Sequence, residues 1–251
     1  MSEALPPAIP AATLVIFRDA PSGPPELLLV ERAKAMTFAA GALVFPGGRI
    51  DQGDRSLAAT LPGDPDDTAA RIAAIRETIE EAGLPIGLTP TPADLASLRR
   101  SLHAGTPFAD ALAIAGSTLD LDDLTPFARW LPQHPGMRIF DTRFYLARLP
   151  AGAPAATVDE TENVHLLWAT AAQVLADADS GRATIIYPTR RNLERLAQFA
   201  SFDDAVAQAR AFPVRTITPW QEERDGLPHL CIPTDLGYPV TAEPLRNAMR
   251  G

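Results

Sequence analysis

The stretch Arg71–Leu84, which reads RIAAIRETIEEAGL, constrains the fold of this chain more than any other. Its apolar positions recur at helical spacing, because a helix advances about 100° per residue. They form one stripe that we expect to be buried: Ile72, Ile75, Ile79 and Ala82. The opposite side of the helix carries three carboxylates: Glu77, Glu80 and Glu81. Gly83 follows as a natural helix end.

The three carboxylates allow two interpretations. Like charges three and four residues apart repel by about a few tenths of a kcal/mol per pair, and Arg76 stands where it can hold Glu80 four residues later. Most such helices simply carry a solvated acidic face. The alternative is a site for hard cations, because Mg²⁺ prefers oxygen ligands and is commonly held by a few carboxylates together with a substrate phosphate.

The segment Phe45–Asp54, which reads FPGGRIDQGD, favours the cation site. An apolar strand there ends in Pro-Gly-Gly, where the backbone can turn sharply and approach a ligand or metal without a Cβ in the way. Two further carboxylates, Asp51 and Asp54, follow. A Gly-Gly turn alone is a weak signal, but its combination with Arg-Glu-x-x-Glu-Glu-x-Gly is much stronger.

Length and composition limit the classes of protein. The 251 residues, 46% of them hydrophobic, suffice for one large domain or for a domain with a sizeable insertion. The net charge of −9 argues against a nucleic-acid partner, and the single cysteine, Cys231, excludes an internal disulfide and a cysteine-based zinc site. No run reaches the roughly 18 apolar residues of a membrane span, so we expect no membrane partner and a cytoplasmic location.

The order of apolar runs and helical patterns predicts an α/β core. Short runs rich in branched residues predict strands at Thr13–Phe17, Leu27–Val30, Leu43–Phe45, Phe144–Ala147, Val164–Trp168 and Thr184–Tyr187. Thr-Pro pairs predict helix starts at Thr91 and Thr106, and capping pairs predict further starts at Thr170 with Gln173 and at Ser201 with Asp204. We expect an exposed loop at Asp51–Asp67, a block without strands at Leu84–Leu131, and a helical C-terminal part.

The glycine turn and the acidic helix together resemble the signature of the Nudix hydrolases. In that signature five residues separate a Gly from a Glu. Seven more residues separate that Glu from Arg-Glu, which is followed by an apolar residue, any residue, Glu-Glu, any residue, Gly and an apolar residue. Gly48 matches the opening glycine, and residues 76–84 match the closing half. Asp54 replaces the first glutamate, Thr78 replaces an aliphatic residue, and the spacer Arg55–Ile75 has 21 residues where the signature has seven.

The resemblance implies a single Nudix domain over residues 1–251, an α/β/α sandwich with a mixed sheet. It also implies a loop insertion at about residues 55–70 and a helical insertion at about residues 88–131. Bound Mg²⁺ or Mn²⁺ would be held by four groups: Glu77, Glu80, Glu81 and the carbonyl of Gly48. Arg76 would orient the glutamates, and Glu162 is the candidate general base, although a solvated loop carboxylate is the alternative. Candidate substrate contacts are Arg32, Arg49 and Arg138.

A narrower likeness is to a long-insertion subgroup of the family that includes coenzyme A diphosphatases of mammalian peroxisomes. It extends from about Thr13 to Asp204 and includes the segments Ile139–Leu149 and Asn192–Asp204. Part of the family's coenzyme A signature fits, namely Leu28, Leu29, Arg32, Gly41, Phe45 and Pro46, whereas three of its polar positions are replaced by Ala33, Thr37 and Ala39. Trp130, beside Arg129, offers an adenine a stacking surface or else anchors the insertion to the core.

Three functions therefore remain open. The first is a metal-dependent diphosphatase acting on coenzyme A or acyl-coenzyme A. The second is the same chemistry on ADP-ribose, a dinucleotide or a nucleotide sugar. The third is a non-catalytic Nudix module that senses a nucleotide or binds a protein. The complete set of three glutamates and an arginine favours an enzyme. The expected partner is a small nucleoside diphosphate derivative, with a homodimer left open.

Overall fold

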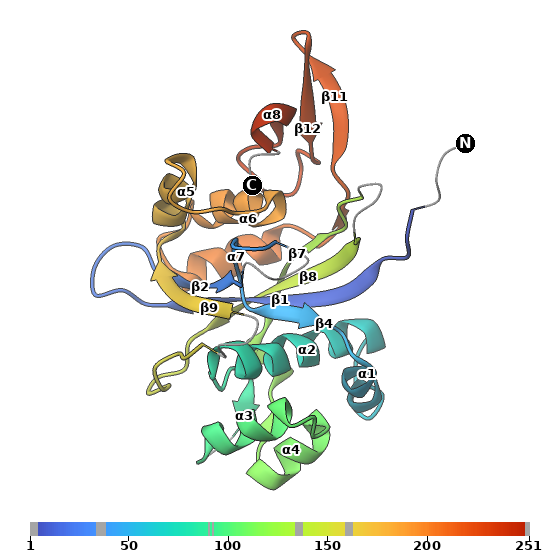
Figure 1. Cartoon of the computed structure of the whole chain (residues 1–251), viewed down its shortest axis with the longest axis vertical. Coiled ribbons are helices and arrows are strands. Elements are labelled where there is room, and N and C mark those ends of the chain that lie inside the picture. Colours follow the sequence, from blue (N-terminus) through green and yellow to red (C-terminus); the bar gives the residue numbers. More distant parts are fainter. Residues whose placement is uncertain are drawn as a thin grey trace.

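The computed structural model describes residues 5–33, 39–89, 91, 93–133, 138–158 and 163–248. A mixed central sheet lies between two layers of helices (Figure 1). Its main path is β10-β7-β8-β1-β2-β3, with β4 paired to β1 and β9 paired to β2. Its strands are β1 (Ile9–Arg18), β2 (Glu26–Arg32), β3 (Leu43–Val44), β4 (Gly47–Arg49), β7 (Thr125–Trp130), β8 (Phe140–Arg148), β9 (Asn163–Ala169) and β10 (Thr216–Ile217). β1 is parallel to β8 and antiparallel to β2 and β4.

Alternate residues of β1 face opposite layers, as the two-residue period of a strand requires. Leu14 and Ile16 belong to a buried cluster shared with the helices on one face. Val15 and Phe17 belong to a second cluster on the other face. On the first face lie α1 (Gln52–Ala58) and α2 (Pro65–Ala82), and α3 (Leu95–His103) and α4 (Phe108–Ala115) pack on the side of these two helices that faces away from the sheet (Figure 1). The second face is covered by α5 (Ala171–Asp179), α6 (Tyr187–Leu196) and α7 (Phe202–Ala211). The predicted α/β/α sandwich with a mixed sheet is confirmed.

α2 is the helix predicted from the sequence, and its limits have local causes. The Asp64 side chain accepts a hydrogen bond from the Asp67 amide, and Pro65 occupies the first turn. The helix ends at Gly83, whose φ of 63° is left-handed. The predicted apolar stripe is confirmed, since all four of its residues are completely buried: Ile72, Ile75, Ile79 and Ala82.

The prediction of an exposed loop at Asp51–Asp67 is wrong, because this segment contains α1 and the start of α2. α1 begins after Asp51, whose amide donates to the Asp54 carboxylate. Asp54 itself is buried. A segment rich in Asp and Gly gives no apolar stripe, and the partner that draws Asp54 inward lies in another helix.

The prediction of a block without strands at Leu84–Leu131 is also wrong. α3 and α4 are helical as expected, but β5 (Leu88–Thr89) pairs with β6 (Thr118–Leu119), a 3-10 turn follows at Leu121–Asp123, and β7 joins the central sheet. The pairing register of β7 shifts between Pro126 and Ala128, where the strand is irregular. A proline in a short irregular strand hides the alternating pattern.

Several predicted ends differ by a few residues. Thr184–Tyr187 is not a strand: the Thr184 carbonyl accepts one hydrogen bond from Leu43, and Tyr187 begins α6. α3 begins at Leu95 and is capped by Asp94 rather than by Thr91. Pro107, not Thr106, occupies the cap position of α4, although Gly116 ends that helix as expected. The capping pairs at Thr170 and Ser201 are confirmed.

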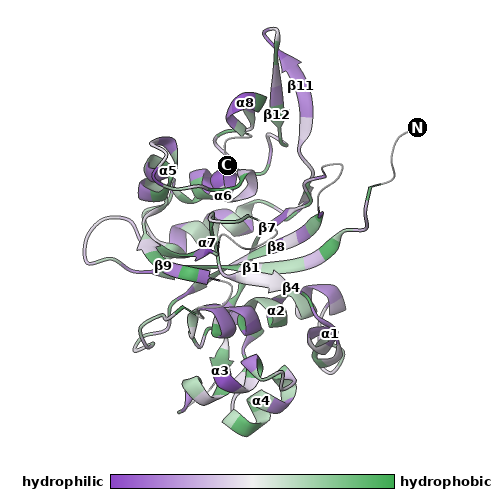
Figure 2. Ribbon diagram, viewed as in Figure 1, coloured by the Kyte–Doolittle hydropathy of each residue, from purple (hydrophilic) through white to green (hydrophobic). Residues whose placement is uncertain are grey.

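The helical C-terminal part is confirmed for α5, α6 and α7, but strands follow. β11 (Trp220–Arg224), β12 (Leu227–Cys231) and β13 (Ala242–Pro244) form a three-stranded sheet, and α8 (Leu245–Ala248) packs on it. The hairpin of β11 and β12 projects from the body (Figure 1), and Figure 2 shows β11 as largely hydrophilic, in agreement with its exposure. Among the described residues, no helix has the length and hydropathy needed to span a bilayer.

Candidate metal and catalytic site

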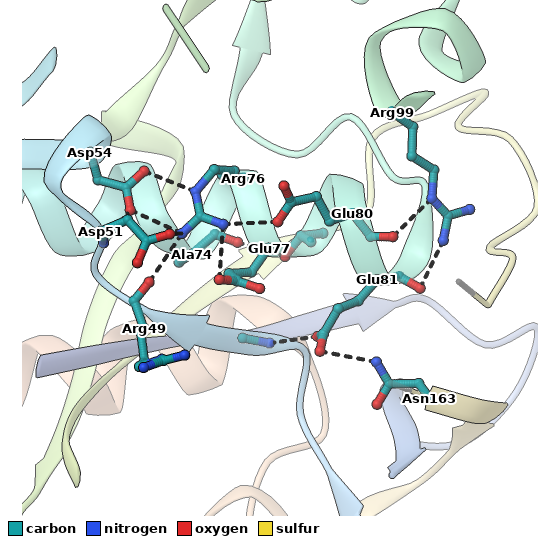
Figure 3. Close-up of polar contacts among 12 residues, drawn as sticks. Arg49, Asp51, Asp54, Ala74, Arg76, Glu77, Glu80, Glu81, Arg99 and Asn163 are labelled. Atoms are coloured by element: carbon teal, nitrogen blue, oxygen red, sulfur yellow. Dashed lines mark hydrogen bonds and ion pairs between the residues drawn. The ribbon is translucent and has the colours of Figure 1, made fainter. Parts of the chain in front are cut away.

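Arg76 is the centre of the polar network on α2 (Figure 3). Its Nε and Nη2 donate to the two oxygens of Asp54, each at 3.0 Å, and Nη2 also donates to the Arg49 carbonyl at 3.0 Å. Its Nη1 donates to Glu77 at 2.9 Å and to Glu80 at 2.8 Å. The predicted pairing of Arg76 with Glu80 is confirmed. Burial opposes the charged form of Arg76, but Asp54, Glu77 and Glu80 raise its pKa further above its ordinary value.

Glu81 is held separately from the other two glutamates. Its Oε2 accepts from the amide of Gly47 at 2.8 Å, and its Oε1 accepts from Nδ2 of Asn163 at 3.0 Å. Glu81 is buried, and the side chains of Glu77 and Glu80 are only 17% and 21% exposed. The interpretation of this face as a solvated acidic surface is therefore wrong.

The two glycines of β4 bring backbone against this cluster. A Cβ added to Gly48 would lie 2.4 Å from the carboxyl carbon of Glu77, and one added to Gly47 would lie 2.3 Å from the carbonyl oxygen of Ala12. Real Cβ atoms do not come this close to other heavy atoms. The Gly-Gly turn therefore packs closely, and the group that approaches Gly48 is the carboxylate of Glu77. The approach of a ligand or metal to this turn stays a prediction.

The cluster has an excess of negative charge. Four carboxylates lie within 4.0 Å of the Arg76 guanidinium, those of Asp51, Asp54, Glu77 and Glu80, and Glu81 adds a fifth nearby. Burial, reinforced by the charges of Glu81 and Glu80 and countered by Arg76, raises the pKa of Glu77 to about 8. Burial also raises the pKa of Glu80, although Arg76 opposes it. Buried carboxylates in such an excess favour a bound cation.

These residues fit Mg²⁺ or Mn²⁺ in donor type, since carboxylate and backbone carbonyl oxygens are what such ions prefer. The absence of a Cβ at Gly48 leaves its backbone open to the Glu77 carboxylate. Within the described part of the chain, however, no three His, Cys, Asp or Glu side chains already stand in a metal-binding group. The arrangement supplies the ligand atoms in two separate sets. Arg76 holds the carboxylates of Glu77 and Glu80. Gly47 and Asn163 hold the carboxylate of Glu81.

The remaining predicted residues are less closely connected. Arg49 is exposed and contributes its carbonyl to Arg76, while Arg32 ends β2 and pairs in register with Asn163. Arg138 is exposed just before β8. The candidate base Glu162 lies outside the described residues. These four assignments stay predictions.

The stacking interpretation of Trp130 is wrong. The side chain is buried, and its Nε1 donates to Asn192 and to the Tyr238 hydroxyl, each at 3.2 Å. Arg129 forms a bidentate ion pair with Asp141. Trp130 therefore anchors β7 to α6.

Sequence reasoning missed two residues that contact the acidic helix. Asn163, the first residue of β9, is completely buried and bonds to Glu81. Arg99, on α3, donates to the carbonyls of Glu80 and Glu81 at 2.9 and 3.1 Å. A polar residue immediately before the apolar run Val164–Trp168 is the local signal that points to Asn163. Arg99 gives no local signal, because its partners lie far away in the sequence.

Comparisons with known proteins agree with the fold and the signature. No family model matches the chain. It is 27% identical to the acyl-coenzyme A diphosphatase NUDT19 of Gallus gallus over 71% of this chain, and it spans only 63% of that relative's length. It is 28% identical to the same enzyme of Homo sapiens, over 91% of this chain and 78% of the relative.

A crystal structure of a Nudix hydrolase from Alicyclobacillus acidocaldarius superimposes with a TM-score of 0.70 at 29% identity, covering 81% of this chain and 97% of that one. The three-layer fold and the carboxylate helix beside a glycine turn are those of a Nudix-type hydrolase, and this chain is similar to Nudix hydrolases in both sequence and structure. Members of this family typically use a divalent metal and act on nucleoside diphosphate derivatives.

Proposed function

We propose that this chain is a metal-dependent diphosphatase that hydrolyses a nucleoside diphosphate linked to another group, with coenzyme A or acyl-coenzyme A as the substrate class. The observation that carries the proposal is the carboxylate cluster of α2, in which Glu77, Glu80 and Glu81 are largely buried beside Gly48. Glu77 and Glu80 share the guanidinium of Arg76, whereas Glu81 accepts hydrogen bonds from Gly47 and Asn163.

The proposed chemistry needs charge neutralisation and in-line positioning more than a covalent intermediate. Bound Mg²⁺ or Mn²⁺ supplies positive charge against the diphosphate oxygens. Its holders in this chain would be Glu77, Glu80, Glu81 and the carbonyl of Gly48. Arg76 fixes the orientation of Glu77 and Glu80 through one nitrogen and does not need to contact substrate.

An anionic substrate needs positive charge at the site. A protein of net charge −9 repels a diphosphate at long range, so local positive charge has to reverse the field at the site. Arg32, Arg49 and Arg138 are the proposed phosphate contacts, and Glu162 is the proposed acceptor of the proton from the attacking water.

The choice of coenzyme A derivatives is supported by the relatives, two of which are named acyl-coenzyme A diphosphatases and resemble this chain over most of its length. A non-catalytic module is less well supported, because recognising a nucleotide does not require several buried carboxylates that repel one another.

The test is a panel of diphosphates incubated with the protein and Mg²⁺ or Mn²⁺, with products identified by mass. The panel contains coenzyme A, an acyl-coenzyme A, ADP-ribose, a dinucleotide and a nucleotide sugar. Release of 3′,5′-ADP with phosphopantetheine or its acyl form is the expected result. AMP from ADP-ribose alone would assign a different substrate to the same chemistry, and no hydrolysis of any member would contradict the proposal.

Glu81→Gln tests the site within that panel. It removes a ligand charge and keeps one oxygen that can still accept from the Gly47 amide. Its NH2 group replaces the oxygen that accepts from Asn163, so the Asn163 amide has to rotate. We expect turnover to fall by about a thousandfold or more with the fold retained. Glu223→Gln, on the exposed strand β11, is the matched control and should leave turnover unchanged.

A further inference from the structure

The last turn of α2 carries two of the three glutamates, and the carbonyls of its last three residues have no donor within the helix. The turn contains no basic residue of its own, although positive charge is favoured at a helix C-terminus. Every one of these carbonyls nevertheless accepts a hydrogen bond. The donors to the carbonyls of Glu80, Glu81 and Ala82 are, in order, Arg99 Nε, Arg99 Nη2 and the Thr157 amide.

Arg99 supplies the missing positive charge from α3, which belongs to the segment between α2 and β7. Its third nitrogen, Nη1, donates to the hydroxyl of Thr157 at 2.7 Å. One guanidinium therefore connects α3, the end of α2 and the segment that follows β8. Figure 3 shows its two bonds to the carbonyls of Glu80 and Glu81. A Cβ added to Gly83 would lie 3.1 Å from Arg99 Nη1, so the glycine at the helix end also leaves room for this contact.

The segment after β8 returns to the same helix turn at a second point. Thr157 binds the carbonyl of Ala82 and the side chain of Arg99, and Asn163 binds the carboxylate of Glu81. Glu81 is thus fixed at its backbone by Arg99 and at its side chain by Asn163 and Gly47.

We propose that Arg99 is a positioning residue for the metal-binding carboxylates. It holds the backbone of Glu80 and Glu81, and in this way sets where their carboxylates stand relative to Glu77 and Gly48. The inference rests on the proposed function, and it gives the insertion a role in the reaction. Groups that orient metal ligands typically change metal affinity by about 10- to 100-fold when they are removed, whereas a helix cap that serves only the fold changes stability alone.

The experiment compares Arg99→Met with Arg100→Met. Arg100 is the next residue of α3 and is exposed, so its substitution removes the same charge without touching α2. Mn²⁺ binding to the substrate-free protein is measured by the loss of the free Mn²⁺ electron paramagnetic resonance signal. Turnover of the substrate identified by the panel then gives kcat and KM at saturating Mn²⁺.

We expect Arg99→Met to weaken Mn²⁺ binding about tenfold and to lower kcat, with KM at saturating Mn²⁺ unchanged within about twofold. Arg100→Met should behave as the wild type. Unchanged Mn²⁺ affinity in Arg99→Met, with only a lower melting temperature, would overturn the positioning role while leaving the proposed function intact. A wild-type protein that neither binds Mn²⁺ nor hydrolyses any diphosphate would overturn the proposed function as well.

Two milder variants keep the test decisive if Arg99→Met does not fold. Arg99→Lys preserves the charge, but its single nitrogen replaces the two nitrogens that donate to the carbonyls of Glu80 and Glu81. Thr157→Val removes only the hydroxyl to which Arg99 donates. Each should weaken Mn²⁺ binding by about two- to fivefold, less than the loss of a complete orienting group. Wild-type affinity in both variants would overturn the inference.

Discussion

Gly48 shows at the scale of one residue why the glycine turn matters. Because Gly48 has no Cβ, the carboxyl group of Glu77 can come close to its backbone. A Cβ added to Gly48 would lie only 2.4 Å from the carboxyl carbon of Glu77. The requirement concerns space and not backbone freedom, because Gly48 does not have a positive φ.

Gly48→Ala should therefore displace Glu77 and lower kcat/KM at least about tenfold, which corresponds to about 1.4 kcal/mol of transition-state stabilisation. Gly53→Ala is the matched control, since nothing lies within 4 Å of a Cβ built there. Because Gly53 lies in α1, alanine should stabilise the protein by about 0.5–1 kcal/mol without changing activity. Equal activity in the two variants would contradict the proposed role of Gly48.

Asp54 and Asp51 provide a second comparison around Arg76. Asp54 is buried and bidentate, whereas Asp51 is 68% exposed at its side chain and 3.8 Å from the guanidinium. Asp54→Asn should lower the free energy of unfolding by about 1–3 kcal/mol, because it weakens a buried charge-assisted pair. Asp51→Asn should cost less than about 1 kcal/mol. Urea denaturation measures the free energy of unfolding of both variants. Equal losses of stability would contradict the prediction that the buried ion pair of Arg76 with Asp54 contributes more than the exposed pair with Asp51.

At the scale of elements, the C-terminal part of α2 was predictable because its signals are local: an apolar stripe at helical spacing and a terminal glycine. Its start, with the capping Asp64 and Pro65, was missed because it lies in a polar segment that resembles a loop. α1 and β7 were not predicted. The contact that stabilises α1 is made with a residue far away in the sequence, and the apolar pattern of β7 is irregular. Asp54 looks like a loop residue until Arg76 is placed beside it, and Pro126 interrupts the pattern of a strand that the sheet completes.

The same division applies to the site. Arg76 and Glu80 are four residues apart, so the helix period alone predicts their contact. Arg99 and Asn163 reach Glu81 from α3 and β9, and only the packed structure brings those elements together. The metal-ligand roles came from a family resemblance, and they remain proposals.

α6 offers a test of electrostatics away from the site. Burial raises the pKa of Glu194 to about 7, although Arg191 and Arg190 oppose the shift, and Glu243 and Asp179 add to it. Between pH about 4.5 and about 7, Glu194 is therefore protonated in the folded protein but ionised in the unfolded chain. Its contribution to stability is complete below pH 4.5 and falls as the pH rises through that window.

Glu194→Gln should remove this dependence. The melting temperature of the wild type, measured relative to the variant, should decline between pH 4.5 and 7 and level off above. A difference between the two proteins that does not vary with pH across this window would contradict the raised pKa.

At the scale of the whole molecule, the C-terminal sheet shares the core of the body. Ile232, Leu236 and Tyr238 belong to the buried cluster between the central sheet and α6, and Arg191 on α6 binds Glu243 of β13. Cys231 lies in this junction and is completely buried.

Cys231 should accordingly report whether this sheet separates from the body. Under native conditions we expect its labelling by an uncharged thiol reagent to be at least about a thousandfold slower than in the unfolded chain, because a buried thiol reacts only after opening. The chain has one cysteine, so the signal is unambiguous. Rapid labelling of the native protein would contradict the shared core.

The proposed hydrolysis depends on divalent cations that bind near the C-terminal end of α2. The most direct measurement is the anomalous difference density of a crystal grown with Mn²⁺. We expect peaks between the carboxylates of Glu77, Glu80 and Glu81 and the carbonyl of Gly48. Density elsewhere, or none there while Glu81 still bonds to Gly47 and Asn163, would contradict the central claim.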